Sequence, residues 1–131
     1  MVSGGKKFKP HLLKERWDYT DTDLLYETAP QSSELNFSRS TVTAIKKGMK
    51  GVVTEDGTAS SVFRGFPVEV GGKTGSAQTQ KGRSAHGVFV SFAPYDDPEI
   101  AVCVVGEYAG SGGSVAPVCV AIYRQYFGLD K

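Results

Sequence analysis

The segment from Pro67 to Glu107 constrains the fold more than any other part of the sequence. Within it, three runs rich in glycine, β-branched or aromatic residues follow one another, at 67–78, 87–93 and 100–107. Polar turn sequences separate these runs, Gln80 to Ala85 in the first gap and Pro94-Tyr95-Asp96-Asp97-Pro98 in the second. Strands joined by such short connections pair in antiparallel fashion. The sequence therefore predicts an antiparallel three-strand meander.

A helix is predicted on each side of this meander. Upstream, the apolar residues recur every three or four positions, and they are Val42, Ile45, Met49 and Val52 or Val53. Ser38 or Ser40 can cap this helix, and Glu55-Asp56-Gly57 ends it. Downstream, Ser114 is expected to cap a helix that stops at Gly128, with an apolar stripe of Val115, Val118, Cys119, Ile122 and Phe127. Helices with one apolar face pack on a sheet, so we expect an α+β fold with one core.

The N-terminal residues are predicted to form a surface hairpin. Phe8 to Trp17 is expected to be a short strand, Asp18 to Asp23 a polar turn, and Leu24 to Glu27 a returning strand. Ala29 to Asn36 is expected to be a loop. Because no repeat, linker or low-complexity segment divides the chain, we expect residues 1–131 to form a single domain.

Composition and charge exclude several functions. With 40% hydrophobic and 22% charged residues, the chain has the composition of a soluble globular domain. A formal net charge of +1 offers no electrostatic surface for nucleic acid, so no nucleic-acid partner is expected. No apolar stretch reaches the roughly 20 residues that span a bilayer, and the first residues lack the features of a signal peptide. We therefore expect this chain to be soluble.

The cysteines and histidines do not indicate a metal or cofactor. Cys103 and Cys119 have no second Cys or His at zinc-ligand spacing, so neither a metal nor a cofactor is expected. A disulfide would require their two elements to pack side by side, and we expect two buried, reduced thiols instead. His11 and His86 are expected to be structural or exposed. The glycine-rich run at 110–113 is expected to be a flexible connection, because it matches no nucleotide fingerprint.

The chemistry is concentrated in the run from Gly71 to Gln78. Lys73 is flanked by small residues on a strand and presents its ammonium beside exposed main chain. Side chains alternate along a strand, so the hydroxyls of Thr74 and Ser76 point to the same side. Such an edge can hold an anion. Gly75 has no side chain to block an extended peptide from pairing with the strand. The predicted ligand is therefore a peptide with a carboxylate.

Lys73-Thr74-Gly75, followed by Ser76-Ala77, resembles the third active-site motif of penicillin-binding proteins. Other segments that resemble class B enzymes follow in the same order, namely Gly4-Gly5-Lys6, Pro10 to Lys14, Gly48 to Val53, Gly57-Thr58-Ala59, His86 to Phe89, Phe92-Ala93-Pro94 and Gly112 to Pro117. The resemblance is strongest to the elongation-type enzymes called penicillin-binding protein 2. It implies a C-terminal fragment of the serine β-lactamase/penicillin-binding transpeptidase fold.

The resemblance also implies roles for individual residues. Lys73 would support the electrostatics and proton transfers around a serine nucleophile, and the backbone N–H of Ser76 would form half of the oxyanion hole. The hydroxyls of Thr74 and Ser76 would bind the terminal carboxylate of a D-alanyl-D-alanine stem peptide or of a β-lactam. The implied catalytic residues are thus Lys73 and Ser76, and the implied substrate-binding residues are Lys73, Thr74, Gly75 and Ser76.

The family's nucleophile motif is expected to lie outside this chain. The family requires a Ser-x-x-Lys and a Ser-x-Asn motif before the Lys-Thr-Gly strand, whereas a residue other than lysine stands three positions after Ser33, Ser38, Ser40 and Ser60. We therefore expect the chain alone to form no acyl-enzyme, while the intact parent would be a D,D-transpeptidase. A non-catalytic peptide- or β-lactam-sensing module and a purely structural fragment remain alternatives.

The resemblance further implies where the parent acts and with which partners. The parent would be anchored in the cytoplasmic membrane with this domain outside, and it would act with other cell-wall elongation proteins. In that fold the strand next to 100–107 comes from earlier in the domain, so the chain alone would expose an apolar sheet edge. Because open edges invite pairing, we expect a homodimer through this edge.

Overall fold

The computed structural model describes residues 3–54 and 56–130. The chain divides into two compact units, Met1–Ser38 and Arg39–Lys131. Every buried residue among those described belongs to the second unit, which contains the one core that the sequence predicts. The expectation that residues 1–131 form a single domain stays a prediction.

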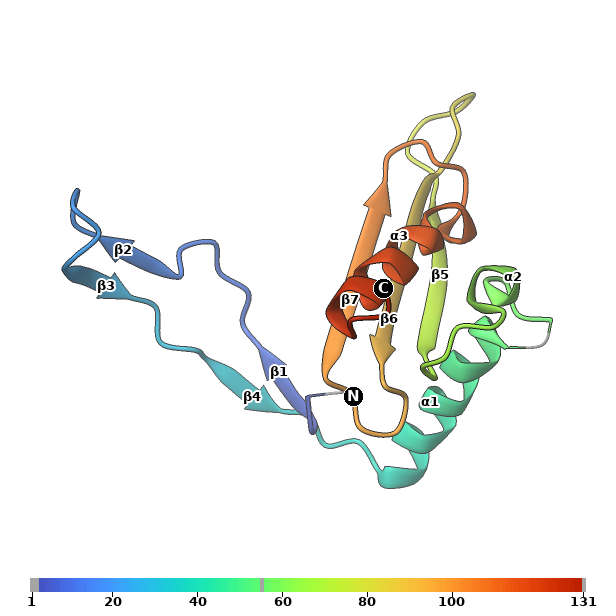
Figure 1. Ribbon diagram of the computed structural model, residues 1–131, viewed down its shortest axis with the longest axis horizontal. Coiled ribbons are helices and arrows are strands. Elements are labelled where there is room, and N and C mark those ends of the chain that lie inside the picture. Colours follow the sequence, from blue (N-terminus) through green and yellow to red (C-terminus); the bar gives the residue numbers. More distant parts are fainter. Residues whose placement is uncertain (1–2, 55, 131) are drawn as a thin grey trace. The chain divides into compact units, whose positions relative to one another are not determined.

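The first unit is a ribbon of short antiparallel strand pairs (Figure 1). Its strands are β1 (Lys6–Phe8), β2 (Glu15–Trp17), β3 (Leu24–Glu27) and β4 (Ser32–Glu34), and β2 pairs with β3 while β1 pairs with β4. The predicted hairpin is confirmed in β2 and β3. Two details were wrong: residues 9–14 are not a strand, and β4 lies in the expected loop. Pro10 has no backbone N–H to donate to a strand ladder, which favours the interruption after β1.

The second unit is built on the predicted meander. Its strands are β5 (Gly71–Ala77), β6 (His86–Ala93) and β7 (Ile100–Gly106), paired antiparallel in the order β5-β6-β7. The first strand begins at Gly71 rather than at Pro67. Thr74 lies opposite Phe89, and Val90 lies opposite Cys103, which fixes the face of the sheet that each side chain occupies. The predicted α+β class is therefore confirmed.

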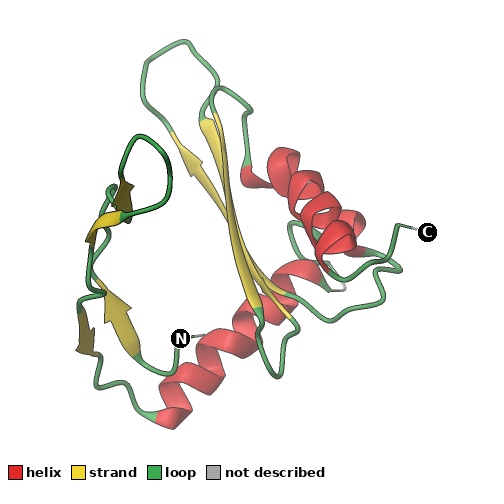
Figure 2. Ribbon diagram, turned by 60° about the vertical axis from the view of Figure 1, so that its left-hand side comes forward, coloured by secondary structure: helices red, strands yellow, loops and turns green. Residues whose placement is uncertain are grey.

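Three helices accompany this sheet: α1 (Arg39–Val53), α2 (Ser60–Phe63) and α3 (Gly112–Tyr126). Helix α3 packs across one face of β6 and β7, and α1 contacts β5 (Figure 2). Helix α1 begins one residue after Ser38, which occupies the N-cap position, so Ser40 lies in its first turn. The short helix α2 was not expected from the sequence.

Helix α3 differs from its prediction in its start and in its buried face. It begins at Gly112 with Ser111 at the N-cap position, not with Ser114. Val118 and Ile122 of the predicted stripe are 49% and 37% exposed, and the residues that face the core are Val115, Ala116, Cys119 and Tyr123. Apolar side chains occur on both sides of this helix, so periodicity alone could not select the face that meets the sheet.

The core lies between α3 and the sheet. Its largest fully buried side chains are Tyr123, Phe89 and Cys119, and the Tyr123 hydroxyl donates a 2.8 Å hydrogen bond to Ser91 Oγ. Burial raises the pKa of Tyr123 to about 12, and burial also raises the pKa of the Cys119 thiol. Cys103 is exposed, contrary to the expectation of two buried thiols, because it lies on the face of β7 opposite to α3.

Candidate substrate-binding site

The Lys-Thr-Gly residues lie on β5, at an edge of the three-stranded sheet. Among the strands that the structure describes, only β6 pairs with β5. Since Thr74 lies opposite the buried Phe89, alternation along the strand directs Thr74 and Ser76 toward the α3 face, whereas Lys73 points to the other face. The outer edge of β5 thus leaves main-chain groups available to an extended ligand.

A surface hollow of about 400 Å³ lies where β5 meets the start of α3. We call it the strand–helix hollow, and its lining residues are Thr58, Thr74, Gly75, Ser76, Ser111, Gly112 and Gly113. The Oγ1 atoms of Thr58 and Thr74 are 2.9 Å apart and share a hydrogen bond. The hollow is therefore lined by hydroxyl groups and main chain, a combination that can donate several hydrogen bonds to a carboxylate.

The two walls of the hollow touch through main-chain atoms at Gly112. A Cβ added there would lie 2.2 Å from the carbonyl oxygen of Val88 and 2.7 Å from the backbone nitrogen of Gly75. No side chain fits in that space, so only glycine allows α3 to begin against β5. Gly112 was quoted in the sequence only as part of a family motif, and its contact with the strand could not be seen from spacing.

Gly75 has different surroundings. A Cβ added at Gly75 would meet Val88 Cβ at 3.5 Å and Val88 O at 3.7 Å, which are ordinary van der Waals contacts. The packing of the chain itself therefore does not require glycine here. A requirement for glycine would have to come from a ligand that approaches the strand.

The predicted site residues are brought together only in part. Thr74, Gly75 and Ser76 line the hollow. Lys73 is exposed and does not line it; its Nζ donates a hydrogen bond to the carbonyl oxygen of Thr74. Thr58, which sequence reasoning did not assign to the site, is part of it, and no local pattern links it to a strand 16 residues away.

A cluster around His86 connects two loops at one end of the sheet. The backbone N–H of Tyr108 donates a 2.9 Å hydrogen bond to His86 Nδ1, and the two rings are 4.8 Å apart. The Arg83 guanidinium lies 5.2 Å from the centre of the Tyr108 ring. His86 thus makes structural contacts, holding the loop after β5 to the loop before α3.

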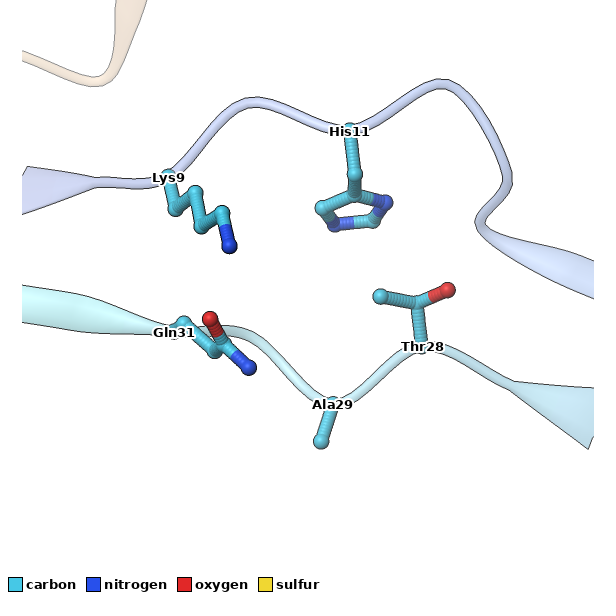
Figure 3. Close-up of a pocket in the computed structure, with 5 residues that line it drawn as sticks. All are labelled: Lys9, His11, Thr28, Ala29 and Gln31. Carbon is cyan, nitrogen blue, oxygen red and sulfur yellow. The ribbon is translucent and has the colours of Figure 1, made fainter.

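The ribbon of the first unit contains a separate hollow of about 110 Å³, shown in Figure 3. Its lining residues are Lys9, His11, Thr28, Ala29 and Gln31. The His11 Nδ1–H donates a 2.7 Å hydrogen bond to the carbonyl oxygen of Leu13, which ties the ring to its own segment. The Thr28 hydroxyl donates a 2.6 Å hydrogen bond to the same carbonyl oxygen, rather than to the His11 ring that could act as its base.

One Ser-x-x-Lys spacing does occur in the sequence, at Ser3-Gly4-Gly5-Lys6. Ser3 Oγ donates a 2.6 Å hydrogen bond to the carbonyl oxygen of Lys6, and both glycines have positive φ, 64° and 87°. These residues form a turn that leads into β1. The Ser3 hydroxyl is thus engaged by main chain in a turn, without the base that activates a serine nucleophile.

Residues 3–54 and 56–130 contain no group of three or more His, Cys, Asp or Glu side chains that could hold a metal ion. No helix within those same ranges is both long and apolar enough to cross a membrane.

The geometry defines a domain with a hydroxyl-lined hollow beside an exposed strand edge. The family model for the penicillin binding protein transpeptidase domain matches residues 1–124. Stage V sporulation protein D of Bacillus subtilis is 31% identical over an alignment of 133 positions, which covers 94% of this chain and 20% of that protein. Peptidoglycan D,D-transpeptidase MrdA of Haemophilus influenzae is 30% identical over an alignment of 145 positions, which covers 96% of this chain and 22% of that protein.

Solved structures of penicillin-binding proteins also match the fold of this chain. PBP2 of Pseudomonas aeruginosa, in complex with WCK 5153, superposes with a TM-score of 0.66 and 30% identity, over 81% of this chain and 23% of that one. PBP2 of Helicobacter pylori, in complex with MreC, gives a TM-score of 0.65 at 21% identity, over 81% of this chain and 21% of that one. The chain belongs to the penicillin-binding protein transpeptidase family. It spans about a fifth of the length of the curated relatives it matches.

Proposed function

We propose that this chain supplies the substrate-binding strand of a peptidoglycan D,D-transpeptidase that cross-links stem peptides and binds penicillin. The observation that carries the proposal is the strand–helix hollow, in which Thr74 and Ser76 of the Lys-Thr-Gly strand face the start of α3 beside an open sheet edge. Membership of the family supports this assignment.

In the proposed complex, the terminal carboxylate of a stem peptide or β-lactam accepts hydrogen bonds from the Thr74 and Ser76 hydroxyls. Hydrogen bonds to an ionised acceptor are about twice as strong as neutral ones. The backbone N–H of Ser76 is proposed as one oxyanion donor, a contribution that is typically worth about 3 kcal/mol in the transition state. Lys73 supplies positive charge near the nucleophile.

The serine nucleophile is proposed to come from a part of the parent protein outside this chain. The turn geometry of Ser3 and Lys6 supports this, because Ser3 Oγ donates its hydrogen to a carbonyl oxygen rather than to a base. We therefore expect no acyl-enzyme on the chain alone. The chain would thus contribute the substrate-binding strand of the active site, and the rest of the parent would contribute the nucleophile.

Labelling with a fluorescent penicillin tests the proposal. We expect strong labelling of the full-length parent, a loss on the order of 10² in the labelling rate for Lys73→Ala, and no labelling of the 131-residue chain. Ser3→Ala in the parent is the matched control and should label like the wild type. If a folded parent takes no label, the enzymatic proposal is wrong, and the strand would serve a sensing or structural module instead.

The parent's location and partners are also proposals. The solved structure of Helicobacter pylori PBP2 in complex with MreC supports the proposal that the parent acts with cell-wall elongation proteins. We propose that the parent is anchored in the cytoplasmic membrane, with this domain on the outer side. Detection of the parent only in the soluble cytoplasmic fraction would contradict this.

For the chain alone, we propose a homodimer through the edge of β7. Among the described strands β7 pairs only with β6, and Val105 on this strand is 62% exposed. An open apolar edge favours association between copies. Sedimentation velocity should show a concentration-dependent dimer that Val105→Lys weakens, whereas a monomer at all concentrations would contradict the proposal.

A further inference from the structure

Thr58 lies beside the binding strand although it is 16 residues from Thr74 in the sequence. Its Oγ1 lies 2.9 Å from Thr74 Oγ1, and its side chain is exposed in the strand–helix hollow. On the other side, its carbonyl oxygen would lie 3.2 Å from a Cβ on Gly113, at the start of α3. Thr58 therefore lies close to both walls of the hollow.

The turn that carries Thr58 is held by its neighbours. The backbone N–H of Ala59, which is fully buried, donates a 2.9 Å hydrogen bond to the carbonyl oxygen of Val52 in α1. A Cβ on Gly57 would lie 2.1 Å from the carbonyl oxygen of Gly51, so main chain packs directly against main chain there as well. The backbone of Thr58 is therefore fixed on both sides, and its hydroxyl has a defined position relative to β5.

The direction of the hydrogen bond follows from the ligand. A hydroxyl has one hydrogen to donate and can accept two hydrogen bonds, whereas an ionised carboxylate only accepts. When Thr74 donates its hydrogen to a carboxylate, it can only accept from Thr58. Thr58 must then be the donor, and each hydrogen bond in such a chain strengthens the next.

We propose that Thr58 is a positioning residue that orients the Thr74 hydroxyl toward a ligand carboxylate. This inference rests on the proposed function of the Lys-Thr-Gly strand. It adds that selectivity for a free carboxylate, over an amide or ester at the same place, depends on a residue outside that strand. Thr58 acts through Thr74 and need not touch the ligand itself.

The test uses two matched variants of the full-length protein. Thr58→Val keeps the shape of the side chain and removes the hydroxyl, while Thr58→Ser keeps the hydroxyl. We expect Thr58→Val to lower the second-order rate of acylation by benzylpenicillin about three- to tenfold, the effect of one hydrogen bond, and Thr58→Ser to stay within about twofold of the wild type. Since Thr58 is exposed, the melting temperature should not change in either variant.

A double-mutant cycle separates positioning from a general structural role. In a Thr74→Val background, Thr58→Val should cause no further loss, because the hydroxyl that it orients is already gone. The inference is overturned if Thr58→Val acylates like the wild type. It is equally overturned if the two losses multiply in the double variant, or if Thr58→Ser loses as much activity as Thr58→Val.

A binding measurement decides the inference even if the parent takes no penicillin. The probes are N-acetyl-D-alanyl-D-alanine and the same dipeptide with a C-terminal amide in place of the carboxylate. Each is titrated into the 131-residue chain, and binding is followed by the NMR signal of the Thr74 backbone N–H. The inference stands if the acid binds more tightly than the amide and Thr58→Val removes that preference. It is overturned if the wild-type chain does not bind the acid or does not distinguish it from the amide.

Discussion

At the scale of single residues, Gly75 and Gly112 show that glycines in one site can have opposite functions. A Cβ on Gly112 would overlap the backbone of both β5 and β6, whereas a Cβ on Gly75 would make ordinary contacts. The packing of the chain requires the first glycine but not the second, for which we propose that the missing side chain leaves space for a ligand.

A pair of alanine variants tests this distinction. Gly112→Ala should lower the free energy of unfolding by about 1–3 kcal/mol, because the backbone must move to accommodate the methyl group. Gly75→Ala should leave stability nearly unchanged but lower penicillin labelling of the parent about tenfold, because the methyl group meets the ligand. Urea unfolding and labelling kinetics measure the two effects. Equal losses of stability in both variants would contradict the distinction.

Tyr123 predicts how stability depends on alkaline pH. Its pKa is about 12 in the folded chain and about 10 when exposed, so the folded chain retains a proton that the unfolded chain loses. The contribution of the protonated Tyr123 to the free energy of unfolding should be fully present below pH 10 and fall by up to about 3 kcal/mol between pH 10 and 12. Urea unfolding across this pH range measures the decline. Tyr123→Phe should flatten the alkaline decline, and an equally steep decline in that variant would contradict the assignment.

Sequence reasoning identified Thr74 and Ser76 but not Thr58, for a physical reason. The first two are two positions apart on one strand, where alternation dictates a shared side. Thr58 reaches the same hollow only through the turn after α1, which the pairing of distant elements brings next to β5. Local spacing contains the first relation and not the second.

At the scale of elements, the meander was predictable and the buried face of α3 was not. Strand runs and turn residues define β6 and β7 within a residue or two. For α3, Val118 and Tyr123 are both apolar enough to face a core, and only the position of Ser91 on β6 gives the Tyr123 hydroxyl a buried partner. The face of α3 that is buried therefore depends on the residues of the sheet that it meets, which the spacing within the helix does not contain.

The turn between β2 and β3 should loosen in acid. The Thr20 hydroxyl and the backbone N–H groups of Asp23 and Thr22 donate to the Asp18 carboxylate and lower its pKa to about 2. The hydrogen bonds to the ionised Asp18 carboxylate stabilise the turn above pH 3.8, the ordinary pKa, and this stabilisation is lost as the pH falls to about 2. The amide signals of Thr22 and Asp23 should titrate in that window. Asp18→Asn should abolish the titration, and an unchanged midpoint near 3.8 in the wild type would contradict the prediction.

At the scale of the whole molecule, the core and the candidate site both belong to residues 39–131. The ribbon of 3–38 contributes no buried side chain, and it exposes aromatic residues such as Trp17 and Tyr19. Its strands are held mainly by their own hydrogen bonds, and short isolated hairpins are marginal in water.

We therefore expect a chain of residues 39–131 to fold on its own, with a melting temperature within a few degrees of that of the 131-residue chain. The amide spectrum of the shortened chain should superpose on that of the longer one at β5–β7 and α3. The matched control is a peptide of residues 1–38, which should have little stable structure. An unfolded 39–131 chain would show that the ribbon contributes to the core.

The contact of Gly112 with β5 also limits how this site can change over generations. Because main chain meets main chain there, no substitution at Gly112 can bring the walls of the hollow closer. Variation is free only in the chemistry of the lining, at positions such as Thr58 and Ser111. A lineage under selection for a different ligand would keep the dimensions of the hollow and alter which groups it presents.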